Sequence, residues 1–240
     1  MKYHLGKNLT ISQLRNRKKL KKIITKLQGE ILDLGCGNGE YSFLMAKKKG
    51  NLITALDASP ELIGEIEKTL EIKKINNISV VKGNAQNLSF KENTFDAVFC
   101  NTVLEHVPEP EKVIRESLRV LKKDRVFVIS IPFLQEVHAD PYDFQRYTPY
   151  GLKYQLEKVG FKNVKISCDY GSLNTMEYLL LGSVVWRVRL GFLKNFPFGY
   201  LYIFFMGILF GLVKLFHIIF LPLQKEDKHF ITQVTGIGRK

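Results

Sequence analysis

Few cysteines, no continuous apolar leader and a shortage of acidic residues set the first limits on this protein. The three cysteines, Cys36, Cys100 and Cys168, form no CxxC pair or other metal-binding spacing, and two of them lie in strand-like apolar runs. Buried, reduced thiols are therefore the expected state. The basic N-terminus lacks both an apolar core and a cleavage site, so no signal peptide is predicted.

Acidic residues are too few to balance the basic ones: 23 oppose 36 lysines and arginines, and the formal net charge is +13. This excess indicates anionic surroundings, such as nucleic acid, anionic lipid headgroups or acidic glycans. The chain of 240 residues is 45% hydrophobic, which is enough for one sizeable core. We therefore expect one domain with an additional segment.

A glycine-rich turn follows the short apolar run 31–34, and it lacks the features of two common phosphate-binding loops. The glycines are Gly35, Gly37 and Gly39, whereas a dinucleotide fingerprint would need a glycine where Glu40 stands. No Lys follows them, which excludes a GxxxxGK[ST] loop. The strand, turn and helix order still favours a nucleotide-like ligand. An adenosine carrying a cation and an amino acid end is the remaining type.

Two carboxylates flank this turn at positions that suit such a ligand. Asp33 ends the first strand and suits an ammonium group, while the following helix N-terminus suits a carboxylate. Asp57 ends the second strand and can accept both hydroxyls of a ribose. Ser59 and Pro60 then predict the start of a helix, as N-cap and first helical residue.

Residues 31–42, ILDLGCGNGEYS, resemble motif I of the class I S-adenosylmethionine (SAM)-dependent methyltransferases. The resemblance extends to D-x-S-P-E at 57–61 and to F-D-A-V and L-E-H-V at 95–107, and it covers roughly residues 29–168. The chain resembles methyltransferases of type 11 and is similar to those of quinone biosynthesis and cell-surface glycans. It implies SAM as methyl donor and S-adenosylhomocysteine as product.

The resemblance and the turn chemistry together predict a set of cofactor-binding residues. The family usually has an acid where this chain has Asn84, whose amide can still accept a hydrogen bond from an adenine amine. A plain Asn/Gly turn is the alternative there. The expected set is Asp33, Gly35, Cys36, Gly37, Gly39, Tyr41, Asp57, Ala58, Asn84, Ala85 and Asn101.

The loop 132–148 after the fifth strand is expected to choose the methyl acceptor. His138 could accept the acceptor's proton, Asp140 or Asp143 could orient it, and Arg146 could hold an anionic group. The stretch 138–148 is similar to bacterial methyltransferases linked with cell-surface polysaccharide. The catalytic candidates are His138, Asp140, Tyr142 and Arg146, together with His106, for which fixing its own loop is the favoured role. We expect no metal, and a metal site of His138, Asp140 and Asp143 is the alternative. A polar loop whose side chains have only a structural role is the alternative to a catalytic loop.

The alternation of strands and helices predicts an α/β, Rossmann-like, doubly wound sheet of seven strands, six parallel and one antiparallel. Strands are expected at 31–34, 52–57, 78–82, 95–101, 125–131, 163–168 and 229–240, with helices at 112–122 and 150–159 among others. The expected domains are a basic N-terminal helix (1–28), a SAM-binding domain (29–168 plus 229–240) and an apolar helical insertion between strands six and seven (169–228). The basic helix either packs on the domain or lies on an anionic surface.

The insertion contains two apolar runs, 176–186 and 196–223, with Arg187, Arg189 and Lys194 between them. Two crossing helices would put these cations on the far side of a membrane, so an in-plane or re-entrant hairpin is favoured. A cap on the protein or a homodimer interface is the alternative.

The sequence as a whole predicts a SAM-dependent methyltransferase at the cytoplasmic membrane surface, peripheral or monotopic. Its acceptor would be a small-molecule or lipid-linked compound: a quinone precursor, a lipid-linked glycan or a lipid. The alternatives are a soluble methyltransferase of tRNA or another anionic polymer, although a nucleic-acid partner is not favoured, and a non-catalytic membrane-associated scaffold.

Overall fold

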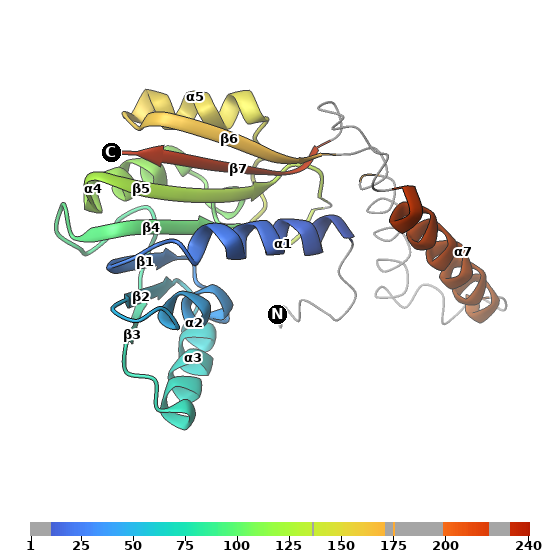
Figure 1. Cartoon of the computed structure of the whole chain (residues 1–240), viewed down its shortest axis with the longest axis horizontal. Helices are drawn as coiled ribbons and strands as arrows, with labels where there is room; N and C mark the ends of the chain where they lie inside the picture. The colour runs from blue at the N-terminus through green and yellow to red at the C-terminus, as the bar shows by residue number, and fades with distance from the viewer. Residues whose placement is uncertain (1–10, 136, 171–174, 176–198, 221–230) are drawn as a thin grey trace. The chain divides into compact units, whose positions relative to one another are not determined.

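The computed structural model describes residues 11–135, 137–170, 175, 199–220 and 231–240, which Figure 1 traces as ribbon. The chain divides into two compact units. The first comprises residues 1–18, 134–136 and 169–232, and the second comprises residues 19–133, 137–168 and 233–240. The second unit holds most of the sheet and every side chain of the candidate site.

Seven strands form one sheet in the order β3-β2-β1-β4-β5-β7-β6, with β7 antiparallel to β5 (Figure 1). The strands are β1 Glu30–Leu34, β2 Leu52–Asp57, β3 Ile78–Lys82, β4 Phe95–Asn101, β5 Leu121–Pro132, β6 Lys162–Tyr170 and β7 Ile231–Arg239. The helices of the described residues are α1 Ile11–Ile24, α2 Glu40–Ala46, α3 Pro60–Lys73, η1 Leu104–His106, α4 Pro110–Val120, α5 Pro149–Val159 and α7 Gly199–Phe220. The predicted doubly wound, seven-stranded fold is confirmed.

One predicted boundary is wrong. The helix expected over 112–122 covers Pro110–Val120, and β5 begins at Leu121 rather than at Arg125. Leu121 pairs with Phe95 of β4 across an irregular register. The residues from Leu121 onward therefore belong to strand β5 and not to helix α4. The predicted helix start at Ser59 is confirmed, because its hydroxyl accepts a hydrogen bond from the backbone N–H of Leu62.

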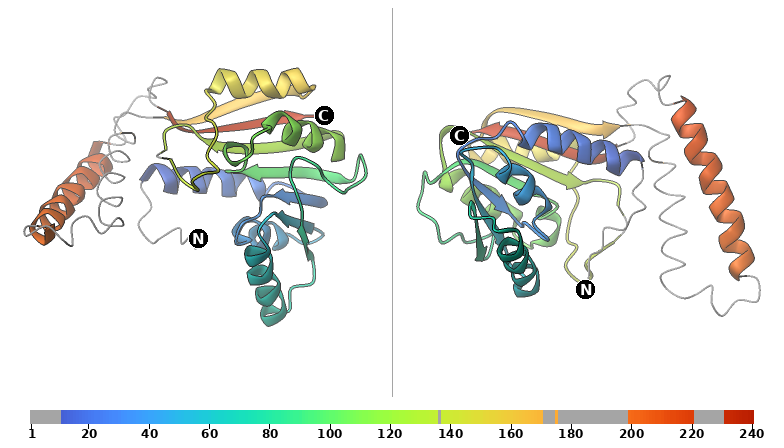
Figure 2. Two further views of the ribbon diagram at one scale, coloured as in Figure 1. Left: turned by 180° about the vertical axis from the view of Figure 1, so that it is seen from behind. Right: turned by 60° about the horizontal axis from the view of Figure 1, so that its bottom comes forward.

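Helices cover both faces of the sheet (Figures 1 and 2). On one face, Leu20 and Ile24 of α1, Met45 of α2 and Ile66 of α3 join the buried apolar side chains of the central strands. Helices α4 and α5 pack together on the other face. Burial of Leu20 and Ile24 supports the packing role that the sequence allowed for the basic N-terminal helix.

Most of the predicted apolar insertion lies outside the described residues, including the whole run 176–186 and the cations between the two runs. Helix α7 is described, and many of its described apolar side chains are exposed. Ten of them are 42–61% exposed: Leu201, Phe204, Phe205, Ile208, Leu209, Leu212, Leu215, Phe216, Ile218 and Ile219. Among the helices of the described residues, none has the length and hydropathy needed to cross a membrane.

Candidate functional site

The three glycines after β1 serve two different structural needs. All have positive φ, which glycine adopts without steric cost. A Cβ on Gly35 would collide with the side chain of Val103, and one on Gly39 would lie 3.0 Å from Phe43 and 3.2 Å from Ile66. A Cβ on Gly37 would meet no atom within 4 Å. Gly35 and Gly39 therefore allow close packing, whereas Gly37 faces open space where a ligand can approach.

Asp57, at the end of β2, holds this turn in place. Its Oδ2 accepts a hydrogen bond from the N–H of Gly37 at 2.8 Å, and its Oδ1 accepts one from the N–H of Ser59 at 3.0 Å. The N–H groups of Gly35 and Cys36 donate to the carbonyl of Leu56 in the same strand. The turn between β1 and α2 is thus organised by the end of the neighbouring strand.

Asp33 is buried beneath this turn, and only 2% of it is exposed. Its Oδ2 accepts a hydrogen bond of 2.5 Å from the hydroxyl of Ser42 in α2. Burial raises the pKa of Asp33 from 3.8 to about 7; the Ser42 hydroxyl opposes that rise, and the charge of Asp57 adds to it. The predicted ammonium-binding carboxylate is therefore a desolvated acid that a cationic ligand would stabilise in its charged form.

The remaining predicted cofactor residues occupy different positions along the same edge. The Cys36 thiol is buried in the hydrophobic core, and the ring of Tyr41 packs edge-on against Phe99. Ala58 is exposed at the end of β2. Asn101, at the end of β4, has a buried Oδ1 that accepts no hydrogen bond within the described part of the chain. An acceptor left in that state points to a ligand that donates to it.

The turn after β3 carries Asn84 and Ala85. The amide oxygen of Asn84 accepts the N–H of Gln86 at 2.9 Å, so it is already used within its own turn. Ala85 is 9% exposed. The next part of the loop is clamped by α4, because Glu116 accepts the N–H of Leu88 and Arg119 donates to the Leu88 carbonyl. The structure places this turn at the same edge as Asp57.

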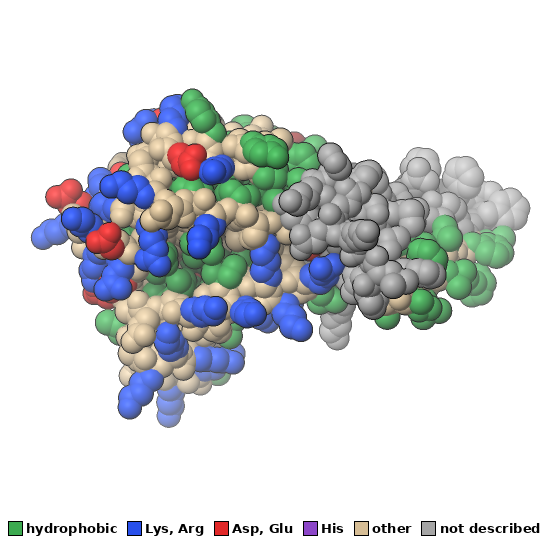
Figure 3. Space-filling view, turned by 45° about the horizontal axis from the view of Figure 1, so that its top comes forward, with side chains coloured by type: hydrophobic (Ala, Val, Ile, Leu, Met, Phe, Trp, Pro, Cys, Tyr) green, Lys and Arg blue, Asp and Glu red, His purple; other side chains and the backbone are tan. Residues whose placement is uncertain are grey.

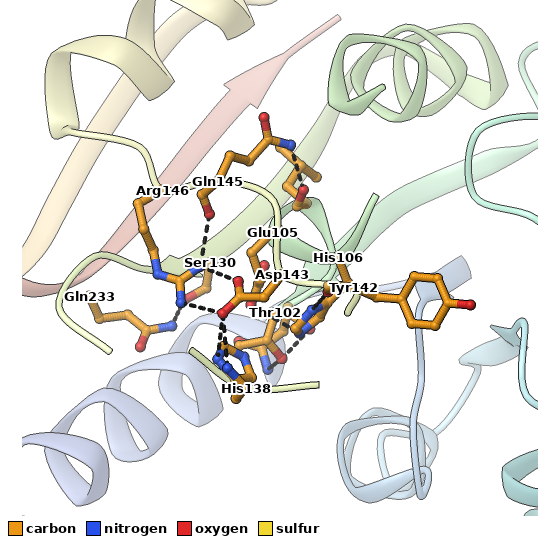
Figure 4. A network of polar contacts seen from close by, with 12 residues as sticks. Thr102, Glu105, His106, Ser130, His138, Tyr142, Asp143, Gln145, Arg146 and Gln233 are labelled. Atoms are coloured by element: carbon orange, nitrogen blue, oxygen red, sulfur yellow. Dashed lines mark hydrogen bonds and ion pairs between the residues drawn. The ribbon is translucent and has the colours of Figure 1, made fainter. Parts of the chain in front are cut away.

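A second polar cluster follows β4 and β5 at this edge (Figure 4). The rings of His106 and His138 meet edge to face, with centroids 4.7 Å apart. Nδ1 of His106 lies 2.6 Å from the carbonyl oxygen of Tyr142, and Nδ1 of His138 lies 3.3 Å from Oδ2 of Asp143. Asp143 is paired in turn with Arg146, which lowers the pKa of Asp143 to about 2. Both imidazoles are thus held by a partner on one ring nitrogen.

Glu105 completes this cluster and is the residue that sequence reasoning missed. It is 1% exposed, and neither of its carboxylate oxygens has a hydrogen-bond partner among the described residues. Burial raises the pKa of Glu105 to about 8. Its Oε1 lies 3.8 Å from Nε2 of His106. The only signal in the sequence was an acid beside a histidine in the turn after a predicted strand.

The other predicted catalytic residues do not converge on the same point. Asp140 is exposed, and the Tyr142 ring is 63% exposed and points away from the two histidines (Figure 4). Arg146 donates to Asp143 and to the carbonyl of Gln145, so its guanidinium serves the loop itself. The structure therefore brings together His106 and His138, with Asp143 and Arg146 behind them.

One contact joins the two parts of the site. Val103 packs against Gly35 of the glycine turn, and Glu105 and His106 follow Val103 within the same short loop and η1. Strands β1 and β4 are paired, with Leu34 opposite Cys100, so both loops leave the sheet side by side. A ligand over the glycine turn would have its far end beside the histidine cluster.

The openness of Gly37 can be tested against a matched glycine elsewhere. Gly37→Ala and Gly50→Ala should each cost about 1 kcal/mol of folding stability, since both glycines have positive φ and open space for a Cβ. Only Gly37→Ala should weaken SAM binding, by about tenfold or more, because its methyl group enters the ligand's space. Calorimetric titration with SAM measures both variants. Equal affinities would show that the ligand does not approach Gly37.

The sequence of the chain is similar to known methyltransferases. Residues 32–129 match the methyltransferase domain family. Demethylmenaquinone methyltransferase of Listeria welshimeri is 33% identical over 109 residues, which are 44% of this chain and 46% of the relative. The rice (Oryza sativa subsp. japonica) 2-methyl-6-phytyl-1,4-hydroquinone methyltransferase 1 is 31% identical over 144 residues, 57% of this chain and 42% of the relative. The chain thus spans about half the length of the curated relatives it matches.

Solved structures share the fold over nearly the whole chain. Phosphoethanolamine N-methyltransferase 2 of Haemonchus contortus, solved with SAM, gives a TM-score of 0.63 at 17% identity, covering 98% of this chain and 54% of that one. A structure from Bacillus halodurans that is named a putative methyltransferase gives a TM-score of 0.58 at 17% identity, covering 94% of this chain and 99% of that one.

The residues present fit SAM. An open Gly37, a buried acid at Asp33, a half-buried acid at Asp57 and an unsatisfied Asn101 oxygen supply the close approach, the countercharge and the hydrogen-bond acceptors that a cationic nucleoside needs. The domain match covers the turn and the strands that carry these groups. The chain therefore carries a methyltransferase domain over residues 32–129, and it resembles the class I SAM-dependent methyltransferases.

Proposed function

We propose that this protein transfers the methyl group of SAM to an acceptor held beside Glu105, His106 and His138. The observation that carries the proposal is the single edge shared by the glycine turn and the histidine cluster, with Val103 packed between them. When bound, SAM would supply a methyl group on a sulfonium: the acceptor's lone pair bonds to the methyl carbon, and the sulfur keeps the electron pair of the broken S–CH₃ bond in S-adenosylhomocysteine. The chain's own residues position the acceptor and take up the proton that the acceptor releases.

We further propose a hydroquinone with an apolar tail as the acceptor. Two of the relatives are named for methylating demethylmenaquinone and 2-methyl-6-phytyl-1,4-hydroquinone. Taken by itself, α7 has exposed apolar side chains that suit contact with amphiphilic molecules. A lipid-linked glycan and a lipid are the other acceptors that the sequence predicted.

The same helix supports a place at the cytoplasmic membrane surface. Its exposed phenylalanines and leucines suit burial among acyl chains, and exposed Arg15, Lys18, Lys22 and Lys26 suit anionic headgroups. Figure 3 shows lysines and arginines spread over one face of the molecule. A homodimer through the apolar insertion is the competing use of α7, and a nucleic-acid partner is the competing use of the basic residues.

The activity is tested by incubating the purified protein with methyl-labelled SAM and short-tailed hydroquinones, lipid-linked glycan extract or tRNA. We expect S-adenosylhomocysteine to form with the hydroquinone. A folded sample that fails to bind SAM in calorimetry would refute the methyltransferase proposal as a whole. Turnover with tRNA alone, together with salt-dependent RNA binding, would show that the acceptor is an anionic polymer and not a hydroquinone. SAM binding without turnover of any acceptor would favour the scaffold.

The membrane proposal is tested by liposome flotation with anionic vesicles. Replacing Leu212 and Leu215 of α7 by Asp should reduce flotation, because charged side chains resist transfer among acyl chains. Ile72→Asp is the matched control, since Ile72 is 80% exposed on α3 of the other unit. An α7 variant that floats as well as the wild type would exclude this helix as the contact.

A further inference from the structure

The buried carboxylate of Glu105 lacks any hydrogen-bond donor among the described residues, yet two histidines lie beside it. One potential ligand atom from each of Glu105, His106 and His138 can be chosen so that all three lie within 4.8 Å of one another. A charged carboxylate buried in this state is unfavourable unless it takes up a proton or a group of opposite charge is bound. A cation between the three side chains would meet the second condition.

Each histidine has Nδ1 beside an oxygen that can accept a hydrogen bond. Because a carbonyl oxygen only accepts, His106 must donate from Nδ1 to Tyr142, and its Nε2 then presents a lone pair on the side of Glu105. Nδ1 of His138 faces the carboxylate of Asp143, which Arg146 fixes from behind. Metal-bound histidines usually donate their second ring N–H to a carbonyl or carboxylate in this way.

The donor set and its spacing select the kind of ion. Two imidazoles and one carboxylate are ligands that zinc accepts, with bonds of about 2.0–2.2 Å and therefore about 3.3–3.6 Å between ligand atoms of a tetrahedron. The distance from Nε2 of His106 to Oε1 of Glu105 is 3.8 Å, close to that range. The other two pairs of potential ligand atoms lie within 4.8 Å, so these atoms would have to move closer together to bind one ion.

We propose that Glu105, His106 and His138 bind a zinc-type divalent cation with one coordination position left open. This set differs from the His138, Asp140 and Asp143 alternative, because Asp140 is exposed and Asp143 is paired with Arg146. It also departs from the sequence-based expectation of no metal. Zinc binding does not depend on methyl transfer. One consequence rests on the proposed function. If the hydroxyl group of the methyl acceptor binds at the open position, the ion would favour the ionised form of that hydroxyl.

The rival interpretation is that Glu105 stays protonated and the histidines act without a metal. The two interpretations differ in a direct binding measurement on the full chain after removal of metal by chelation. Zinc is titrated in competition with a coloured chelator, and cobalt is added as a spectroscopic probe of coordination. We expect one zinc per chain and the visible absorption of four-coordinate cobalt.

Variants locate the site. Glu105→Gln keeps the shape and removes a buried charge, so it should fold and lose stoichiometric zinc binding; His138→Gln should do the same. Asp143→Asn should weaken binding by about 10–100-fold through the orientation of His138. Replacing the three other histidines, His4, His217 and His229, by Ala is the matched control and should leave binding intact. Wild type that binds no zinc, or Glu105→Gln that binds it equally well, would overturn the proposal. SAM titration of the same samples reports the cofactor site separately.

Discussion

Asp57→Asn should weaken SAM binding by roughly tenfold to a hundredfold, the loss expected when a charge-assisted hydrogen bond of about 1.5–3 kcal/mol is removed. Asp57 accepts from the N–H of Gly37 with one oxygen and from the N–H of Ser59 with the other. An amide has only one acceptor oxygen, so one of these N–H groups would face an NH₂ group. The turn that receives the ligand would relax, and the predicted ribose acceptor would lose its charge.

Asp96 offers the matched control for that experiment. Like Asp57, it accepts a backbone N–H, here from Glu30 at 3.1 Å; unlike Asp57 within the described part of the chain, it pairs with Lys122 at 3.1 Å. It lies near the start of β4, however, at the opposite edge of the sheet from the glycine turn. Asp96→Asn should therefore cost stability without changing SAM affinity in calorimetry. Equal loss of affinity in both variants would mean that the effect comes from general destabilisation.

In the ligand-free protein, Asp33→Asn should raise the free energy of unfolding relative to the wild type by more at pH 8 than at pH 5. Burial raises the pKa of Asp33 to about 7, above its ordinary 3.8. The folded chain therefore binds this proton more tightly than the unfolded chain, and stability falls as the pH rises through that interval. The wild type should lose about 2–3 kcal/mol between pH 5 and pH 8 that the variant keeps.

Urea unfolding of both proteins at the two pH values measures this difference, and titrations common to both cancel in the comparison. The charged group that faces Asp33 most closely, Asp57, is unchanged in the variant. A stability difference that does not vary with pH would contradict the raised pKa of Asp33. The same variant should bind SAM more weakly, because the neutral amide no longer attracts a cationic ligand. Stability would then be gained where ligand binding is lost.

Much of the fold was predictable because the signals are local. Seven strands and the helix start at Ser59 follow from hydrophobic runs and capping residues that act within a few positions. The glycine turn was predictable for the same reason. The boundary error at Leu121 came from pairing with Phe95 in another strand, which no local pattern records.

The candidate site was predictable in part. Asp57 and the glycines have a fixed spacing along the chain, and the structure places them together through the N–H of Gly37. Glu105 was missed because its isolation from donors depends on what surrounds it after folding. Asp140 and Tyr142 share the loop of His138, but neighbouring residues of an irregular loop point in different directions, and both lie exposed.

The sequence alone determined the strand–turn–helix unit and the chemistry of its ligand, since Asp33 and the glycines lie within a few positions of one another and Asp57 follows at the end of the next strand. Only the tertiary structure decided that β7, from the end of the chain, pairs with β5, and that Glu105 meets His138 across two strands. The physical reason is that burial and desolvation depend on which distant segments pack together. A carboxylate with no donor cannot be read from its neighbours in the chain.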